Sequence, residues 1–244
     1  MKTKLIALSL FVTTAATVAL FPTLKDALAV PQVNIQPVVV PPVSQINKEK
    51  PKVEAVFVLD TTGSMSGLIQ AAKEKIWSIA NTMASAQPAP EIRIGLVAYR
   101  DRGDAYVTKV VDLSTDLDSV YATLMDFRAG GGGDGSESVN QALDDALNKV
   151  SWSQEQNSYK VIFLVGDAPA HMDYQDDVKY PVTLANAKQR GIVVNAIQAG
   201  NEGETSMMWR QVAALGSGDY FQVEQSGNAV AIATPFDKEM AELS

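Results

Sequence analysis

The sequence contains no cysteine and only one histidine among its 244 residues. Without cysteine the chain has no disulfide framework and no thiol to which a lipid could be attached. Its stability must therefore come from a hydrophobic core, which a chain of this length and ordinary apolar content can form. A bound metal ion could add to that stability, because a ligand that binds only the folded state stabilises it.

Positive charge is also scarce. The chain has 20 Lys and Arg residues against 28 Asp and Glu residues, which gives a formal net charge of −8. No basic run or basic–aromatic patch interrupts this balance, so the sequence predicts no nucleic-acid partner. The N-x-S/T acceptor of N-glycosylation is absent as well, which favours a bacterial over a eukaryotic exported protein.

The N-terminus has the pattern of an export signal. Lys2 and Lys4 precede an uncharged apolar stretch at residues 5–21, and Ala27-Leu28-Ala29 forms a small-x-small site. This pattern is typical of a secretory signal peptide, here residues 1–29, cleaved after Ala29. The apolar stretch is longer than most signal cores, so an uncleaved N-terminal membrane anchor is the alternative. We therefore expect an exported protein, periplasmic or extracellular, that meets the membrane only through such an anchor.

The next segment, residues 30–52, holds five prolines among Val, Gln and Asn residues. Proline prevents helix formation, and the segment has few residues that could pack in a core. It is therefore predicted to be an extended, semi-stiff linker. The folded domain is predicted to cover residues 53–244.

Within this domain, apolar strand patterns alternate with helical patterns. Strands are predicted at residues 53–59, 92–99, 106–113, 159–165, 192–199 and 220–223. Helices are predicted at residues 68–86, from a cap at Ser114 or Thr115 to 127, from 138 to about 150, and at 182–190, 205–215 and 229–243. The short link at residues 100–105 indicates a hairpin and hence one antiparallel edge strand. The pattern predicts an α/β fold with a doubly wound, mostly parallel central sheet and helices on both faces.

Several polar residues follow strands of this predicted sheet, where ligands bind in such folds. Asp60 ends the first strand, and Thr62 and Ser64 follow it at a spacing of two. Asp167 ends a later apolar strand, and Asp134 lies in a glycine-rich loop. Oxygen ligands without His or Cys suit a hard cation, Mg²⁺ before Ca²⁺ or Mn²⁺. Thr62 and Ser64 can turn their hydroxyls to one point, with the aspartates acting directly or through water.

The stretch D-T-T-G-S-M-S resembles the D-x-S-x-S motif of von Willebrand factor A domains, which include integrin I domains. Asp60, Thr62 and Ser64 match its three positions, with Thr for the middle Ser. Asp167 in FLVGDAP matches the acidic residue that ends the fourth strand of the family. The resemblance covers residues 53–244, and it implies a metal-ion-dependent adhesion site. In such a site an acidic side chain of a protein partner completes the metal's shell.

The glycine-rich loop departs from the family's pattern. The family usually has a Thr there, whereas GGGGDGSES offers Asp134, with Ser136 as the nearby hydroxyl. The sequence leaves open which of the two takes that position. A carboxylate would hold the ion more tightly in the resting state and weaken its pull on a partner's carboxylate. The residues therefore support metal binding more directly than adhesion.

Two other interpretations of the strand that ends on Asp60 are open. The metal could be purely structural within an envelope complex, or the chain could be a Mg²⁺-dependent phosphohydrolase of the haloacid-dehalogenase type. Those enzymes need a second acid two residues after the nucleophile, where this chain has Thr62. A serine hydrolase is excluded because Met65 occupies the serine position of G-x-S-x-G. We therefore predict a binding domain and not an enzyme.

Four further sequence features are explained by the fold without a role in binding. His171 is predicted to be a loop residue, although it could flank the site. Asp101 is predicted to be a surface charge, although it could lie behind the metal's ligands. The tripeptide Arg102-Gly103-Asp104 is interpreted as a coincidence within the hairpin. Met207-Met208-Trp209 fits the core-facing side of an amphipathic helix.

Overall fold

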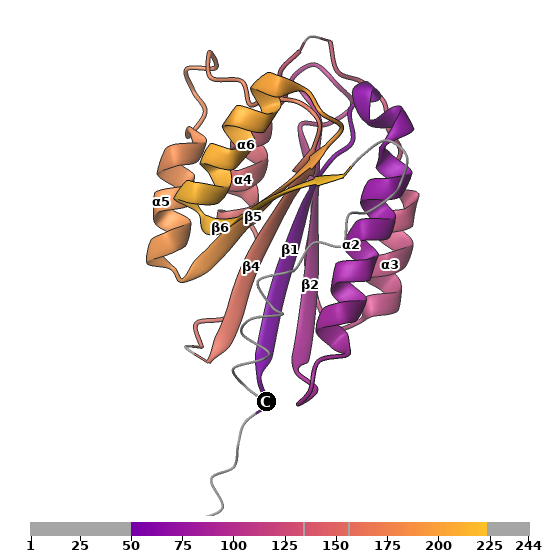
Figure 1. Ribbon diagram of the computed structural model, residues 1–244, viewed down its shortest axis with the longest axis vertical. Helices are drawn as coiled ribbons and strands as arrows, with labels where there is room; N and C mark the ends of the chain where they lie inside the picture. Colours follow the sequence, from indigo (N-terminus) through magenta and orange to yellow (C-terminus); the bar gives the residue numbers. More distant parts are fainter. Residues whose placement is uncertain (1–49, 134, 156, 224–244) are drawn as a thin grey trace, which may run out of the picture. The chain divides into compact units, whose positions relative to one another are not determined.

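The computed structural model describes residues 50–133, 135–155 and 157–223 (Figure 1). The predicted signal segment, residues 30–49 of the linker, Asp134 and the helix predicted at residues 229–243 lie outside the described residues. In chain order the elements are β1 (Lys52–Asp60), the 3₁₀ helix η1 (Gly63–Gly67), α2 (Ile69–Ala84), β2 (Glu91–Tyr99), β3 (Thr108–Ser114), α3 (Leu117–Asp126), α4 (Val139–Asn148), β4 (Ser158–Gly166), α5 (Tyr180–Gln189), β5 (Ile192–Ala199), α6 (Gly203–Leu215) and β6 (Ser217–Val223).

The described strands form one sheet in the order β3-β2-β1-β4-β5-β6. Every neighbouring pair is parallel except β2 and β3, which pair antiparallel at the edge. The Arg100 amide donates to the Val107 carbonyl at 2.9 Å and closes the β2–β3 hairpin. The predicted doubly wound, mostly parallel sheet with one antiparallel edge strand is confirmed.

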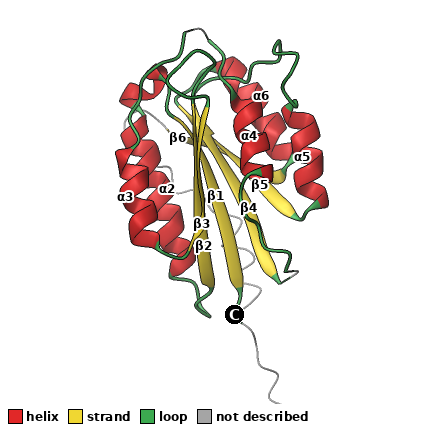
Figure 2. Ribbon diagram, turned by 180° about the vertical axis from the view of Figure 1, so that it is seen from behind, coloured by secondary structure: helices red, strands yellow, loops and turns green. Residues whose placement is uncertain are grey.

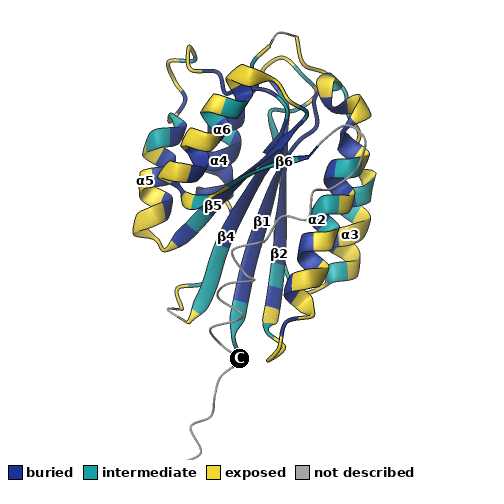
Figure 3. Cartoon of the chain, in the orientation of Figure 1, coloured by how far each residue is buried: buried dark blue, intermediate teal, exposed yellow. Residues whose placement is uncertain are grey.

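Helices cover both faces of the sheet, with α2 and α3 on one face and α4, α5 and α6 on the other (Figures 1 and 2). Successive side chains of a strand point to opposite faces. Phe57 therefore packs in the core beneath α2 and α3, while Val56 and Val58 pack beneath the other helices. The Phe57 ring stacks on Phe163 of β4, with 5.0 Å between ring centroids. The central strands are buried toward their carboxyl ends, as Figure 3 shows.

Some local details differ from the sequence predictions. The side chain that caps α3 is Asp116, whose carboxylate accepts a hydrogen bond from the Ser119 amide at 3.1 Å, and not Ser114 or Thr115. Ser114 instead ends β3. In α6 the predicted core packing holds for Trp209, which is fully buried, but Met207 is 70% exposed. Helical spacing places these two residues on different sides of the helix.

Within residues 50–133, 135–155 and 157–223, no helix is both long enough and apolar enough to cross a bilayer.

Replacing Phe57 by Ala should lower the free energy of unfolding by about 3–5 kcal/mol, because it opens a cavity in the middle of the sheet. Urea denaturation followed by circular dichroism measures this loss. Val182→Ala on α5 is the control, since Val182 is 54% exposed and its truncation should change stability by no more than about 0.5 kcal/mol. Equal effects of the two substitutions would contradict the described core.

Candidate metal centre

Asp60, the last residue of β1, has a fully buried side chain. Its Oδ1 atom accepts hydrogen bonds from the Thr62 amide at 2.8 Å and from the Thr62 hydroxyl at 2.6 Å. An Asp side chain that bonds to the backbone two residues ahead favours a turn. This local bond therefore helps the chain leave the sheet immediately after β1. The other oxygen, Oδ2, is buried and has no hydrogen-bond partner among the described residues.

The hydroxyls of Thr62 and Ser64 extend the polar contacts of Asp60 toward solvent. The Thr62 hydroxyl lies 3.0 Å from the Ser64 hydroxyl, and the Ser64 hydroxyl donates to Asp167 Oδ1 at 2.9 Å. Asp167 follows β4, the strand that pairs with β1. Four residues that the sequence singled out therefore lie in one series of hydrogen bonds and oxygen contacts from Asp60 to Asp167. The fifth, Asp134, lies outside the described residues.

The glycine-rich loop is fastened to the loop after β1 by two backbone hydrogen bonds. Gly63 donates to the Gly131 carbonyl, and Gly130 donates to the Thr61 carbonyl, each at 3.0 Å. A Cβ atom on Gly63 would lie 2.7 Å from the Gly131 oxygen, and Gly131 has a φ of +79°. Both positions therefore need glycine, which explains why this approach is possible here.

The loop also delivers Glu137, an acidic residue that the sequence reasoning did not select. Its side chain is buried, and its Oε2 atom has no hydrogen-bond partner in the described part of the chain. The main chain of Glu137 is held by the Pro169 carbonyl at 2.9 Å and by the His171 amide at 3.0 Å. The sequence signal was an acid just before a helix, but spacing alone does not say which loop residue faces inward.

A cavity of about 440 Å³ opens beside this group. It is lined by Ser64, Gly135, Glu137, Asp167, Ala168, Pro169, Glu202, Glu204 and Thr205. Another cavity, of about 500 Å³, lies by the amino ends of β4 and β5, and none of the site residues lines it. The carboxyl end of the sheet is therefore where the hydroxyls and carboxylates can meet a ligand from solvent, as expected for this topology.

Burial changes the acidity of the carboxyl groups. It raises the pKa of Asp60 to about 7, although the hydrogen bonds from Thr62 act in the opposite direction. Burial, followed by the charges of Asp60 and Asp101, raises the pKa of Glu137 to about 8. Burial also raises the pKa of Asp167. Each shift disfavours the ionised form, and a nearby cation would favour it.

The donor set fits a hard divalent cation. Two buried carboxylate oxygens lack donors, on Asp60 and Glu137, and two hydroxyls lie in the same group. Within the described ranges, no three His, Cys, Asp or Glu side chains converge closely enough to hold a metal ion by themselves. The hydroxyls of Thr62 and Ser64 would therefore have to serve as ligands, a role that oxygen-seeking ions such as Mg²⁺ accept.

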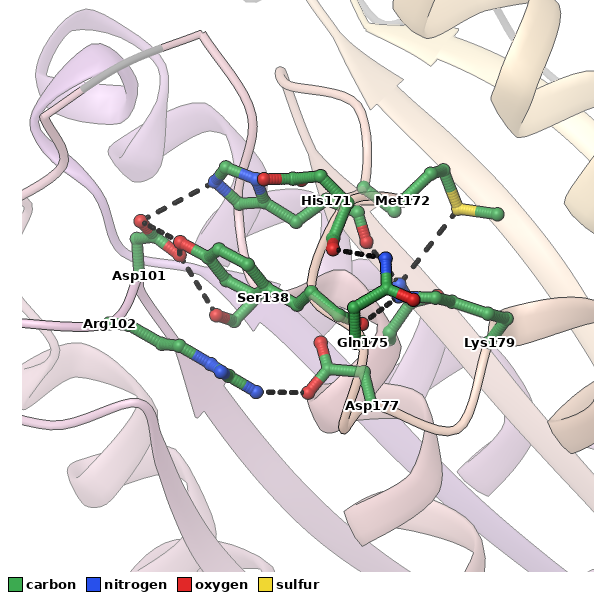
Figure 4. A network of polar contacts seen from close by, with 12 residues as sticks. Asp101, Arg102, Ser138, His171, Met172, Gln175, Asp177 and Lys179 are labelled. Carbon is green, nitrogen blue, oxygen red and sulfur yellow. Dashed lines mark hydrogen bonds and ion pairs between the residues drawn. The ribbon is translucent and has the colours of Figure 1, made fainter.

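A second polar network, shown in Figure 4, includes Ser138, the residue that directly follows Glu137. Asp101 accepts hydrogen bonds from the Ser138 hydroxyl at 2.9 Å and from the Tyr174 hydroxyl at 3.0 Å, and His171 Nε2 lies 3.5 Å away. The prediction that Asp101 is a surface charge was therefore wrong, because the loop after β2 turns this side chain inward. His171 does lie in a loop, but it is buried, with Nδ1 2.8 Å from Asp173.

The Arg102-Gly103-Asp104 tripeptide takes part in the fold's own contacts. Arg102 forms ion pairs with Asp176 and Asp177. Asp104 Oδ2 accepts a hydrogen bond from the Gly132 amide at 2.8 Å. The tripeptide therefore connects the loop after β2 with the loop before α5 and with the glycine-rich loop.

Residues 54–234 match the family model described as the von Willebrand factor A (VWA) domain. The chain belongs to this family. VWA domains generally mediate protein–protein interactions. The family assignment agrees with the order of strands and helices and with the antiparallel edge strand of the sheet.

One curated relative is an alpha-protein kinase, vwkA, of Dictyostelium discoideum. It is 28% identical to this VWA chain over 120 residues, which are 49% of this chain but 19% of the kinase. The chain therefore spans only a small part of the length of that relative. The match supports a shared domain and says nothing of the kinase activity.

Two solved structures show the fold. The conserved hypothetical protein BatB from Bacteroides thetaiotaomicron superposes with a TM-score of 0.57 at 17% identity, covering 78% of this chain and 99% of BatB. Proximal thread matrix protein 1 of the mussel byssus superposes with a TM-score of 0.55 at 16% identity, covering 80% of this chain and 45% of that one. The mussel structure is described as having a zinc-occupied MIDAS motif, the metal-ion-dependent adhesion site of VWA domains.

The raised pKa values give a pH prediction for the chelated protein. In EDTA, the folded state should hold protons on Asp60 and Glu137 up to higher pH than the unfolded state does. Stability should therefore fall as the pH rises from about 5 to 8, and Tm should decrease over that range. Asp60→Asn should reduce the decrease, because Asn carries no charge to bury. A Tm that stays constant or rises over this range would contradict the burial of these carboxylates.

Proposed function

We propose that this VWA domain binds a divalent cation, Mg²⁺ before Mn²⁺ or Ca²⁺, and uses it to hold a protein partner. Thr62 and Ser64 would supply hydroxyl ligands, and Asp60 and Asp167 would act directly or through water. The observation that carries the proposal is the series of hydrogen bonds and oxygen contacts from Asp60 to Asp167 at the carboxyl ends of β1 and β4. The zinc-occupied MIDAS of the mussel protein supports a divalent metal on this fold.

The partner would reach the ion from the cavity side. Ser64 is exposed, and Asp167 is half-buried, so this end of the series faces solvent while Asp60 does not. A bound cation attracts an anionic oxygen, and an acidic side chain of the partner would complete its shell. Asp60, Thr62 and the glycine-rich loop would then fix the ion's position from the buried side of the site.

The same geometry favours a binding function over hydrolysis. Asp60 is fully buried and already accepts two hydrogen bonds from Thr62, so a phosphoester in solution has no access to it as a nucleophile. Nucleophilic catalysis needs the attacking atom within reach of the substrate. We therefore propose that the domain is not an enzyme.

The proposed function is tested with two matched serine substitutions in η1. Ser64→Ala should weaken Mg²⁺ binding by about 10-fold or more, as loss of metal-site contacts commonly does. Ser66→Ala should leave binding unchanged, because Ser66 is exposed in the same turn and lies outside the series from Asp60 to Asp167. Isothermal titration calorimetry of the purified protein with Mg²⁺ measures both affinities.

Partner capture is the second readout of this experiment. Immobilised wild-type protein and Ser66→Ala should retain an envelope protein in Mg²⁺ and release it in EDTA, whereas Ser64→Ala should not retain it. Capture that survives both EDTA and Ser64→Ala would exclude a metal-dependent interaction. A large loss of Tm on chelation, without metal-dependent capture, would instead indicate a purely structural metal.

We also propose that the protein is exported, either released after cleavage or held by an N-terminal anchor. Residues 1–29 support this through their charge, apolar stretch and small-x-small site. In a bacterial host, the N-terminal sequence of the protein recovered outside the cytoplasm should begin at Val30 if cleavage follows Ala29. An intact Met1 in the membrane fraction indicates the anchor, and recovery only from the cytoplasm would exclude export.

A further inference from the structure

Glu137 occupies a fixed position at the candidate metal centre. Its main chain is paired with the segment after β4 through the Pro169 carbonyl and the His171 amide, in a short parallel bridge opposite Ala170. Ser138 directly follows it and donates to buried Asp101. The main chain is therefore held on both sides of Glu137, whose side chain lines the cavity together with Ser64 and Asp167.

The carboxyl group of Glu137 lies close to Thr62, the residue whose amide and hydroxyl donate to Asp60. A Cβ atom built on Gly132 would be 3.2 Å from Glu137 Oε1 and 3.5 Å from Thr62 Cβ. Gly132 therefore leaves open a space that both side chains border. The Glu137 carboxylate therefore lies on the side of Thr62 that faces the glycine-rich loop.

No cationic side chain in the described part of the chain pairs with this carboxylate, and Thr62 is its side-chain hydrogen-bond partner. Glu137 is 2% exposed, its Oε2 atom lacks a hydrogen-bond partner, and none of the ion pairs between described residues includes it. Asp60 Oδ2 is buried and without a partner in the same way. Buried acceptors without donors or cations are costly, and two of them in one group call for a common positive ligand.

We propose that Glu137 is a resident carboxylate ligand of the divalent cation, at the loop position for which the sequence offered Asp134 or Ser136. This inference rests on the proposed function, because it requires that the domain binds a cation. The series from Asp60 to Asp167 supplies two carboxylates, and Glu137 adds a third. These three side chains do not converge closely enough to hold a metal ion by themselves. Glu137 would therefore act together with the hydroxyls of Thr62 and Ser64, and its charge would strengthen the domain's own hold on the ion.

Glu137 would also change what the partner encounters. A partner's carboxylate would have to compete with a carboxylate that the domain itself holds beside the ion. Glu137 should therefore strengthen metal binding and weaken the binding of an external carboxylate to the loaded site. These opposite effects separate a ligand from a residue that only maintains the fold.

The metal arm of the test uses Mg²⁺ alone, titrated into wild type, Glu137→Gln, Glu137→Thr and Glu204→Gln by calorimetry. Both Glu137 variants should raise the Kd for Mg²⁺ by about 10-fold or more. Glu204→Gln should stay within about 2-fold, because Glu204 is an exposed acid that lines the same cavity. The thermal stability of each variant is measured in EDTA at the same time.

The Tm of each variant in EDTA shows whether a loss of Mg²⁺ binding comes from a less stable fold. Each Glu137 substitution removes a buried acidic group whose Oε2 atom lacks a hydrogen-bond partner in the described part of the chain, so both variants should melt in EDTA at or above the wild-type temperature. A lower Tm for both variants would assign Glu137 a role in the fold and overturn the inference. If wild type binds Mg²⁺ and both variants bind within about 2-fold of it, only the inference fails. If wild type binds no Mg²⁺, the proposed function fails as well.

The second arm uses acetate as the external carboxylate and Mn²⁺ as a paramagnetic reporter. With each protein saturated in Mn²⁺, acetate should displace metal-bound water at lower concentration in Glu137→Thr than in wild type. Water-proton relaxation measures that displacement. Equal or weaker acetate binding in Glu137→Thr would show that Glu137 does not compete for the ion.

Discussion

The carboxylate of Asp60 sets the main constraint on this end of the sheet. It is buried at the end of the central strand, among neighbours that supply hydrogen bonds but no opposite charge within the described residues. Taking a carboxylate out of water is expensive unless hydrogen bonds and counter-charge replace the solvent. Thr62 satisfies one oxygen, and the other is left facing the interior.

The surroundings of Asp60 are shaped to admit it. A Cβ atom on Gly166 would lie 2.7 Å from Asp60 Cβ and 2.5 Å from the Tyr99 hydroxyl. The strand β4 therefore needs glycine at the position beside Asp60, or the two strands could not keep their spacing here. Burial, and then the charge of Asp60, raises the pKa of Tyr99, so the phenol stays neutral beside the carboxylate. Gly166 and Tyr99 therefore help to hold the Asp60 side chain in a fixed position next to the hydroxyls of Thr62 and Ser64.

Most of the fold could be predicted from the sequence, because apolar runs of strand length alternate with helical patterns along the whole domain. Asp60, Thr62, Ser64 and Asp167 could be found because they lie on or directly after β1 and β4, and strand ends meet at one edge of a parallel sheet. The inward position of Glu137 could not be found in this way. It depends on backbone bonds between loops that are distant in sequence and on glycines with positive φ, such as Gly131.

The same limit applies to Asp101, whose burial depends on Ser138 and Tyr174 from two other loops. Local patterns describe a residue's own segment, and a charged residue after a strand is exposed in most proteins. The cap of α3 was missed for a smaller reason. Ser114, Thr115 and Asp116 are all suitable capping residues, and only the end of β3 decides among them.

The bond between Ser64 and Asp167 has a consequence for the order of events as the chain is made. The two residues are 103 positions apart, and α2, β2, β3, α3, α4 and β4 come between them in sequence. During synthesis, Asp60, Thr62 and Ser64 are made long before β4 emerges and docks beside β1. Closing so long a loop is entropically unfavourable until the sheet contacts form. If the domain binds a cation as proposed, uptake of the ion should therefore follow the assembly of the central strands.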